Sequence, residues 1–260
     1  YLSAMDQRDL AAFGRPFVSL NMSMSADGKI ATANRVVNSF GSRKDRDHLY
    51  ELRARADAVV CGSRTAEAAG VTMGPGPSRF RQQRIRRGLA EYNLRVVVSG
   101  TGSVDTRAAL FRAKFSPLII LTTGRVPQSR LCRMARVADE VVVCGAKVLN
   151  WPAALGWLRK RWNITRLLCE GGAELNASLF EAGVIDELHL TICPYVIGGQ
   201  RAPTLADGQG VDALADAFEL PLVSFRGVGD ELFCVFKTAG SKPAGATNST
   251  HSPRHRSPPT

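Results

Sequence analysis

Short runs of β-branched and aliphatic residues alternate along this chain with longer segments of helical periodicity. The runs have the length and composition of strands and cover residues 17–24, 57–62, 95–100, 117–123, 139–145, 166–172 and 186–199. Apolar residues recur at i, i+3 and i+4 in the segments 42–55, 127–138, 150–162 and 173–183, which predicts helices. Strands that are almost continuously apolar must be buried on both faces. The alternation therefore predicts a mostly parallel, twisted sheet flanked by helices.

The C-terminal part of the pattern differs from the rest. Residues 220–238 contain two strand-like runs that meet at 227–230, which predicts an antiparallel hairpin added to the sheet. We expect one doubly wound α/β domain over residues 16–238 of the 260. Residues 1–15 are weakly patterned and are expected to form an N-terminal extension. Residues 239–260 lack large apolar side chains and are expected to be a disordered tail.

Charge and composition narrow the class of protein. The chain has 34 Lys and Arg against 23 Asp and Glu, a formal net charge of +11 that favours an anionic partner. No apolar run approaches the roughly 18 residues that a membrane helix needs, and no apolar signal core is present near residue 1. We therefore expect a cytoplasmic protein without a membrane partner. Six cysteines without a Cys-x-x-Cys pair and four isolated histidines predict reduced thiols and no metal site.

The feature that most suggests chemistry is a strand that passes through two glycines directly into a helix. Glu170 ends this strand, and Gly171 and Gly172 precede the helix. Paired glycines let the backbone approach a ligand closely, and the N–H groups of a helix N-terminus suit a phosphate. A tight turn that binds nothing has the same pattern, so the motif alone leaves both interpretations open.

A second transition of this kind ends the strand predicted at 57–62. Gly62 is followed by Ser63, Arg64 and Thr65, whose hydroxyls and amides would suit a second phosphate, with the arginine to meet extra negative charge. An N-capped helix that binds nothing is the alternative.

The first predicted strand carries a polar row. Asn21, Ser23 and Ser25 share one face of an otherwise apolar strand, and Asp27 and Lys29 follow it. Buried polar side chains need hydrogen-bond partners, and the edge of a ligand would supply them.

Together these motifs resemble the reductase domain of bacterial riboflavin biosynthesis, a relative of dihydrofolate reductase. The resemblance is carried by N-x-S-x-S-x-D-G-K-I-A from residue 21, D-A-V-V-C-G-S-R-T from residue 57 and L-L-C-E-G-G-A-E-L-N-A-S-L-F from residue 167. It implies a dihydrofolate reductase-like fold, NADPH as the cofactor and no metal. The implied reaction reduces 2,5-diamino-6-ribosylamino-4(3H)-pyrimidinone 5′-phosphate, with hydride transfer to C1′ of the ring-opened sugar. A homodimer with the C-terminal strands near its interface is also implied.

The resemblance assigns roles to individual residues. Cofactor contacts are implied at Ser23, Gly62, Thr65, Ser99, Gly171, Gly172, Ala173, Glu174, Leu175 and Asn176. Substrate contacts are implied at Asn21, Asp27, Lys29, Arg53 and Glu170. Glu170 is the first candidate for the proton donor, with Asp27 or water as the alternatives. A carboxylate beside a helix N-terminus tends to stay ionised, so we expect Glu170 to bind first and to act as an acid second.

Other functions remain open. Residues 66–74 depart from the family's loop over the substrate, so a reductase of a pterin, dihydrofolate or another small carbonyl or imine compound is an alternative. A basic nucleotide- or RNA-binding module is the non-enzymatic alternative, because residues 79–87 contain five arginines. A solvated basic helix would give the same run. The double glycine favours a cofactor site, so we expect a phosphorylated small-molecule substrate and no nucleic acid.

Overall fold

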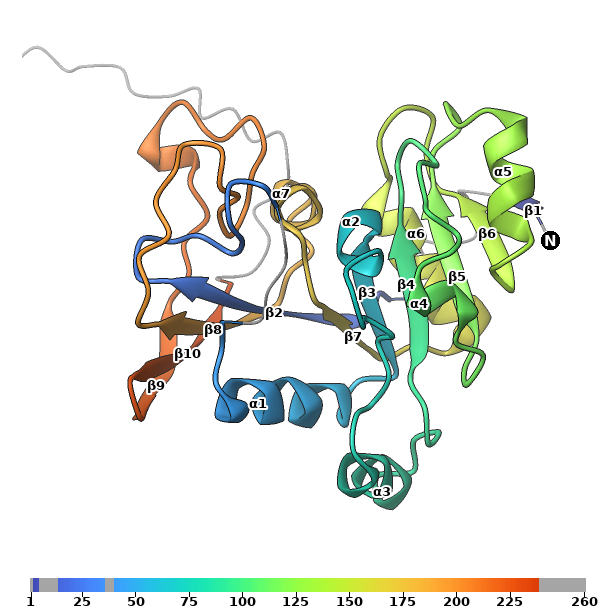
Figure 1. Ribbon diagram of the computed structural model, residues 1–260. Helices are drawn as coiled ribbons and strands as arrows, with labels where there is room; N and C mark the ends of the chain where they lie inside the picture. Colours follow the sequence, from blue (N-terminus) through green and yellow to red (C-terminus); the bar gives the residue numbers. More distant parts are fainter. Residues whose placement is uncertain (1, 5–13, 36–39, 239–260) are drawn as a thin grey trace, which may run out of the picture.

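The computed structural model describes residues 2–4, 14–35 and 40–238. Within these residues, ten strands form one sheet in the order β1-β6-β5-β4-β3-β7-β2-β8-β10-β9 (Figure 1). The strands are β1 (Leu2–Ala4), β2 (Phe17–Ser25), β3 (Ala58–Gly62), β4 (Leu94–Val98), β5 (Leu118–Thr122), β6 (Glu140–Val143), β7 (Arg166–Cys169), β8 (Glu187–Cys193), β9 (Leu222–Val228) and β10 (Glu231–Lys237). All seven strands predicted outside the C-terminal hairpin are present, although β8 ends at Cys193 rather than at residue 199.

The helices that connect these strands include all four that the periodicity predicts. They are α1 (Arg43–Arg53), α2 (Ser63–Ala66), α3 (Ser78–Arg86), α4 (Ala109–Arg112), α5 (Gln128–Ala135), α6 (Trp151–Trp162) and α7 (Ala173–Glu181), with a 3-10 turn η1 at Leu214–Asp216. Ser42 begins α1 by accepting hydrogen bonds from the amides of Lys44 and Asp45, and Asn150 begins α6 in the same way. Among the described helices, none has the length and apolar character needed to cross a membrane.

The pairing confirms the predicted fold class. From β1 to β8 every neighbouring pair is parallel, as in the register Leu20 to Cys169 between β2 and β7. The hairpin of β9 and β10 then joins β8 in antiparallel orientation, with Cys234 opposite Leu190. β1 pairs with β6 at the far edge, so residues 2–4 of the expected N-terminal extension belong to the sheet. The tail expected to be disordered lies outside the described residues.

Helices cover both faces of the sheet. Successive strand residues point to opposite faces, so each strand contributes side chains to two separate core clusters. Val60 and Val96 contribute to a core cluster with residues of α6 and α7, such as Leu158 and Leu179. The alternate strand residues form a second cluster with Leu52 of α1, Phe111 of α4 and Met134 of α5. Both clusters consist of fully or almost fully buried side chains. The sheet is therefore doubly wound, as the apolar strands predict.

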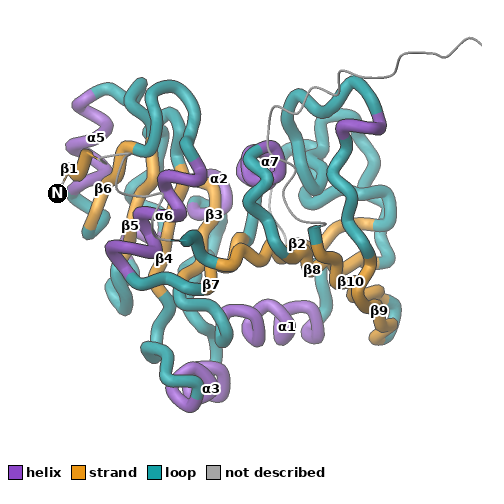
Figure 2. The backbone as a smooth tube through the Cα atoms, turned by 180° about the vertical axis from the view of Figure 1, so that it is seen from behind, coloured by secondary structure: helices purple, strands orange, loops and turns teal. Residues whose placement is uncertain are grey.

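The sheet forks between β7 and β2, because the two strands pair over only part of their length. β2 pairs with β7 only from Phe17 to Leu20 and continues to Ser25 beside β8, whereas β7 ends at Cys169. Figures 1 and 2 show α1 running along one side of the sheet where β7, β2 and β8 meet. This fork lies at the carboxyl ends of parallel strands, which is where doubly wound sheets bind ligands.

Candidate functional site

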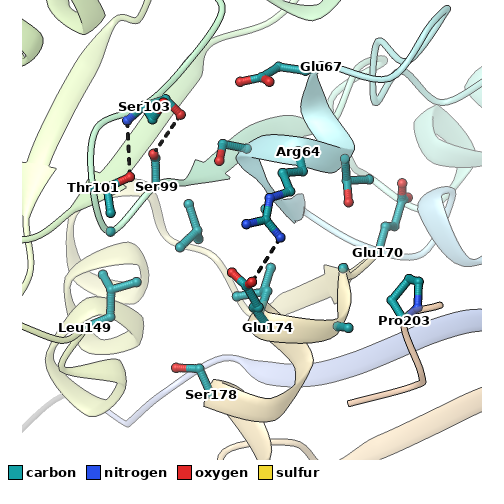
Figure 3. A pocket seen from close by; sticks show the side chains of 18 of the residues that line it. Arg64, Glu67, Ser99, Thr101, Ser103, Leu149, Glu170, Glu174, Ser178 and Pro203 are labelled. Carbon is teal, nitrogen blue, oxygen red and sulfur yellow. Dashed lines mark hydrogen bonds and ion pairs between the residues drawn. The ribbon is translucent and has the colours of Figure 1, made fainter. Parts of the chain in front are cut away.

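A cavity of about 610 Å³ lies in the fork. Met22 of β2 lines one side, Gly62 and Val98 at the ends of β3 and β4 line the other, and Glu170 lies where β7 ends. Figure 3 shows charged and hydroxyl side chains of several elements around this space. The strand ends therefore bring together residues that are more than 100 positions apart in the sequence.

The paired-glycine corner lies between β7 and α7, and Gly172 of this corner lines the cavity. Gly171 has φ +78°, and a Cβ at this position would lie 2.6 Å from the sulfur of Met22. Only glycine meets both conditions without strain. The peptide bond to Gly172 is cis. The amide of Gly62 donates to the carbonyl of Gly171 at 2.8 Å, which fixes the corner to the end of β3.

Two helix N-termini border the cavity on either side of this corner. α7 begins after Gly172 and α2 begins after Gly62, and no side chain caps either N-terminus. A Cβ on Gly172 would lie 3.4 Å from the hydroxyl oxygen of Thr65, so the absence of a side chain keeps this space open. Helix N-termini carry partial positive charge and N–H donors, which together suit an anionic group such as a phosphate.

The far wall consists of the loops that follow β4, β5 and β6. It carries the hydroxyls of Ser99, Thr101, Ser103 and Thr123 and the cationic groups of Arg125 and Lys147. Of these, the family resemblance pointed only to Ser99. The others were missed, although each follows a predicted strand and the carboxyl-end rule would have found them. Hydroxyls beside two cations can hold a second anionic group.

Glu170 and Arg53 form a bidentate ion pair at the base of the cavity. Arg53 Nε and Nη2 donate to the two carboxylate oxygens at 2.6 Å each, and Nη1 donates to the carbonyl of Gly74 at 2.6 Å. The two side chains are only 11% and 10% exposed. Burial alone would lower the pKa of Arg53, but the charge and hydrogen bonds of Glu170 outweigh it and the pKa is raised. Arg53 thus reaches the cavity only through Glu170.

A second ion pair spans the mouth of the cavity. Arg64 of α2 donates to the carboxylate of Glu174 in the first turn of α7 at 2.9 Å (Figure 3). These side chains are 65% and 67% exposed, in contrast to the buried pair below them. The pair joins the two uncapped helix N-termini.

The polar row of β2 faces α1 and does not line the cavity. Ser23 donates to Asp45 of α1 at 2.7 Å, and burial raises the pKa of this carboxyl. Asn21 is buried beside His189, and its Oδ1 accepts no hydrogen bond from the described residues. The expected partner was a ligand edge, but for Ser23 the partner is a helix side chain. Asp45 itself was missed, because an acidic residue near a helix N-terminus reads as a surface residue.

Asp27 and Lys29 fasten the loop beside the cavity. Asp27 accepts hydrogen bonds from the hydroxyl of Ser25 and from the amides of Ile197 and Gly198, which lower its pKa to about 2. Lys29 donates to the carbonyl of Ala202, and its backbone forms a bridge with Thr204. The neighbouring Ile30 and Pro203 reach the cavity lining. Asp27 and Lys29 therefore do not line the cavity themselves, but they hold in place the loop residues that do.

The candidate residues thus divide into two groups. Those that line the cavity are Gly62, Thr65, Ser99, Glu170, Gly172, Ala173, Glu174 and Leu175. Those that do not are Asn21, Ser23, Asp27, Lys29, Arg53, Gly171 and Asn176. Asn176 is fully buried and donates from Nδ2 to the carbonyl of Leu205 at 2.7 Å, which makes it part of the support behind the helix N-terminus.

Of the five arginines at residues 79–87, only Arg84 is buried, and the other four are exposed or half-buried. Most of them belong to α3 and are engaged within the chain: Arg79 with Asp47, Arg81 with Glu91, Arg84 with the carbonyls of Arg53, Ala56 and Ala90, and Arg87 with the carbonyl of Ala54. Arg84 is 1% exposed and caps the C-terminal end of α1. Arg84 is therefore part of the scaffold, whereas the rest of the run lies at the surface with several of its charges paired.

Comparison with known proteins finds a single family over most of the chain. The model of the RibD C-terminal domain matches residues 16–233. A 2,5-diamino-6-ribosylamino-4(3H)-pyrimidinone 5′-phosphate reductase of Methanothermobacter thermautotrophicus is 31% identical over 226 residues, covering 87% of this chain and 100% of that relative. The protein of the same name from Aquifex aeolicus is 28% identical over 222 residues, covering 84% and 94%.

Solved structures share the fold. A pyrimidine reductase-like protein of Corynebacterium diphtheriae superposes with a TM-score of 0.71 at 22% identity, covering 87% of this chain and 93% of that one. RibD of Acinetobacter baumannii superposes with a TM-score of 0.67 at 19% identity, covering 86% and 58%.

Proposed function

The chain belongs to the RibD C-terminal domain family, and on this basis we propose that it is an oxidoreductase of riboflavin biosynthesis. Its substrate is the one that names its relatives, 2,5-diamino-6-ribosylamino-4(3H)-pyrimidinone 5′-phosphate. The acceptor of the hydride is C1′ of the ring-opened sugar. The observation that carries this proposal is the cavity in the fork, where a paired-glycine corner and two uncapped helix N-termini meet Glu170.

The residues of the cavity fit a dinucleotide. A reduced nicotinamide dinucleotide supplies the hydride when it is bound. The amides at the start of α7, from Gly172 to Leu175, would hold its diphosphate with those at the start of α2. The absence of a side chain on Gly172 leaves the space beside Thr65 that such contact requires.

The far wall favours NADPH over NADH. NADPH differs by one additional phosphate, which requires cations and hydroxyl donors at the end of the site away from the reacting ring. Arg125 and Lys147 supply two positive charges there, beside the hydroxyl of Thr101. Arg125 is held toward this wall by a hydrogen bond from Nε to the carbonyl of Gly100 at 3.2 Å.

The carboxylates near the fork have different roles. Glu170 lies at the cavity with both oxygens already bonded to Arg53, so it orients the substrate by accepting further hydrogen bonds from its amino or hydroxyl groups. Asp27 is a poor proton donor because three hydrogen bonds hold its pKa at about 2. We assign it, with Lys29, to ordering the loop of Ile30. The proton that accompanies the hydride would then come from water.

The direct test is the oxidation of NADPH by the purified protein with the pyrimidine phosphate, and with dihydrofolate as the control substrate. Turnover of the first and not of the second is expected. Thermal unfolding with each dinucleotide gives an independent readout, because NADPH should raise the melting temperature well above the effect of NADH. If neither dinucleotide shifts the melting temperature, the proposal fails.

The proposed partners follow from two surfaces. Arg84 is buried, and Arg79 and Arg81 are paired with Asp47 and Glu91, which supports a small-molecule partner more than nucleic acid. β9 is an edge strand whose side chains are exposed, including Leu222, Val223 and Phe225 at 51%, 53% and 69%. An apolar edge strand of this kind is usually covered. We propose that a second copy of the chain covers it, which light scattering of the wild type and of Phe225→Glu would test.

A further inference from the structure

We infer that Glu174 acts as an internal counter-ion, which pairs with Arg64 in the free protein. When the cofactor binds, one of its phosphates takes the place of the Glu174 carboxylate as the partner of Arg64. The inference rests on the proposed function. Arg64 and Glu174 both line the cavity, and Nη1 of the arginine donates to the carboxylate at 2.9 Å. Figure 3 shows the arginine reaching from α2 across the space toward α7. The pair therefore lies at the N-terminus of α7, which is proposed to hold the diphosphate.

The exposure of the pair makes the exchange inexpensive. Both side chains are about two-thirds exposed, so water screens their attraction and little is lost when they separate. Arg53 and Glu170 provide the contrast within the same cavity, because they are almost fully buried and bonded through two donors. One arginine is thus fixed as a support, whereas the other is free to change its partner.

The position of Glu174 also matches that of an anion. It is the second residue of α7, whose N-terminus has no side-chain cap, so its carboxylate lies in the positive field of the helix end. A phosphate at the same amides would meet this negative charge at close range. Glu174 therefore weakens binding of the cofactor in two ways, by repelling the phosphate and by occupying Arg64.

Arg64 is suited to the new partner. A guanidinium can bind a phosphate through two N–H donors and stays charged at every relevant pH. After the exchange, the arginine would hold the phosphate together with the amides at the start of α7.

The experiment measures the dissociation constant of NADPH by calorimetry at low salt for the wild type, Glu174→Gln, Arg64→Gln and the double variant. We expect Glu174→Gln to bind about two- to fivefold more tightly. Arg64→Gln should bind about tenfold or more weakly. In the Arg64→Gln background the effect of the second substitution should shrink. Glu181→Gln is the matched control, because it removes the same charge at the other end of α7 and should leave the dissociation constant unchanged.

Each outcome bears on a distinct claim. If the wild type binds NADPH and Glu174→Gln binds equally or more weakly, the inference is overturned and the proposed function stands. A melting temperature of Glu174→Gln well below that of the wild type would give the pair a purely structural role. If the wild type binds no dinucleotide, both the inference and the proposed function fail. Loss of the difference between the wild type and Glu174→Gln in high salt would support the electrostatic origin.

Discussion

Arg53 holds Glu170 through two parallel hydrogen bonds of 2.6 Å each, so the residue that directly follows β7 is fixed by the last residue of α1. The same guanidinium bonds the carbonyl of Gly74. One side chain thereby joins a helix, a loop and the carboxyl end of a central strand. The direction of the Glu170 carboxylate at the cavity follows from this connection.

Arg53→Ala should destabilise the fold. The substitution leaves the carboxylate of Glu170 buried without its partner, which typically costs about 3 kcal/mol. Urea unfolding would measure the change in the free energy of unfolding. Arg43→Ala is the control, since Arg43 is an exposed arginine at the other end of the same helix. A loss equal to that of the control would show that the pair contributes nothing to stability.

Glu170→Gln should impair the reaction and spare the cofactor. The amide keeps the shape and one acceptor, but it loses the charge that positions the substrate, so kcat/KM for the pyrimidine phosphate should fall at least about tenfold. The dissociation constant of NADPH should change by less than about twofold. Equal losses in both quantities would contradict the assigned role.

The adjacent glycines of the corner should respond differently to alanine. Gly171→Ala places a Cβ 2.6 Å from the sulfur of Met22 at φ +78°, and should lower the free energy of unfolding by about 2 kcal/mol. Gly172→Ala has φ −75° and contacts only Thr65, so it should stay folded and weaken NADPH binding about tenfold. Gly14→Ala, at an exposed glycine with open space around it, is the control for both measurements. Unimpaired NADPH binding by Gly172→Ala would remove the corner from the cofactor site.

His48→Gln should reduce the loss of stability in acid. Burial, with the nearby His189, Arg226 and Arg55, lowers the pKa of His48 to about 4. The unfolded chain has a histidine pKa of about 6.5, so it binds the proton first. His48 therefore has no effect on the free energy of unfolding well above pH 6.5, and it lowers that free energy as the pH falls from 6.5 toward 4. Because His48 is partly exposed, the variant should recover about 1 kcal/mol between pH 7 and pH 4.5 in urea unfolding. Parallel pH profiles for variant and wild type would refute this.

Much of the fold follows from periodicity. The strands that became β2 to β8 were apolar enough to require two covered faces, and the hairpin of β9 and β10 was marked by its turn. β8 is shorter than predicted because Pro194 follows Cys193 and cannot donate to the strand ladder. The apolar residues beyond it, such as Val196, are exposed in a loop and do not extend the strand.

The site was harder to predict, because a sequence pattern does not show what covers each face of a strand. The polar row of β2 correctly signalled a need for hydrogen-bond partners. The partner for Ser23 came from Asp45, and nothing in the helical pattern of α1 distinguishes a buried acidic residue from a surface one. The same limit applies to Arg84, whose burial depends on carbonyls at the end of a helix that precedes it by about thirty residues.

The rim of the cavity near β2 is held by Asp27 and Lys29 to residues 197–204, which form a loop and no part of any strand. Changes in the length or composition of that loop would reshape the entrance while leaving the sheet and the glycine corner unaltered. Directed evolution toward other carbonyl substrates should therefore begin at the exposed residues of this loop and leave the buried Ala202 and Pro203 in place.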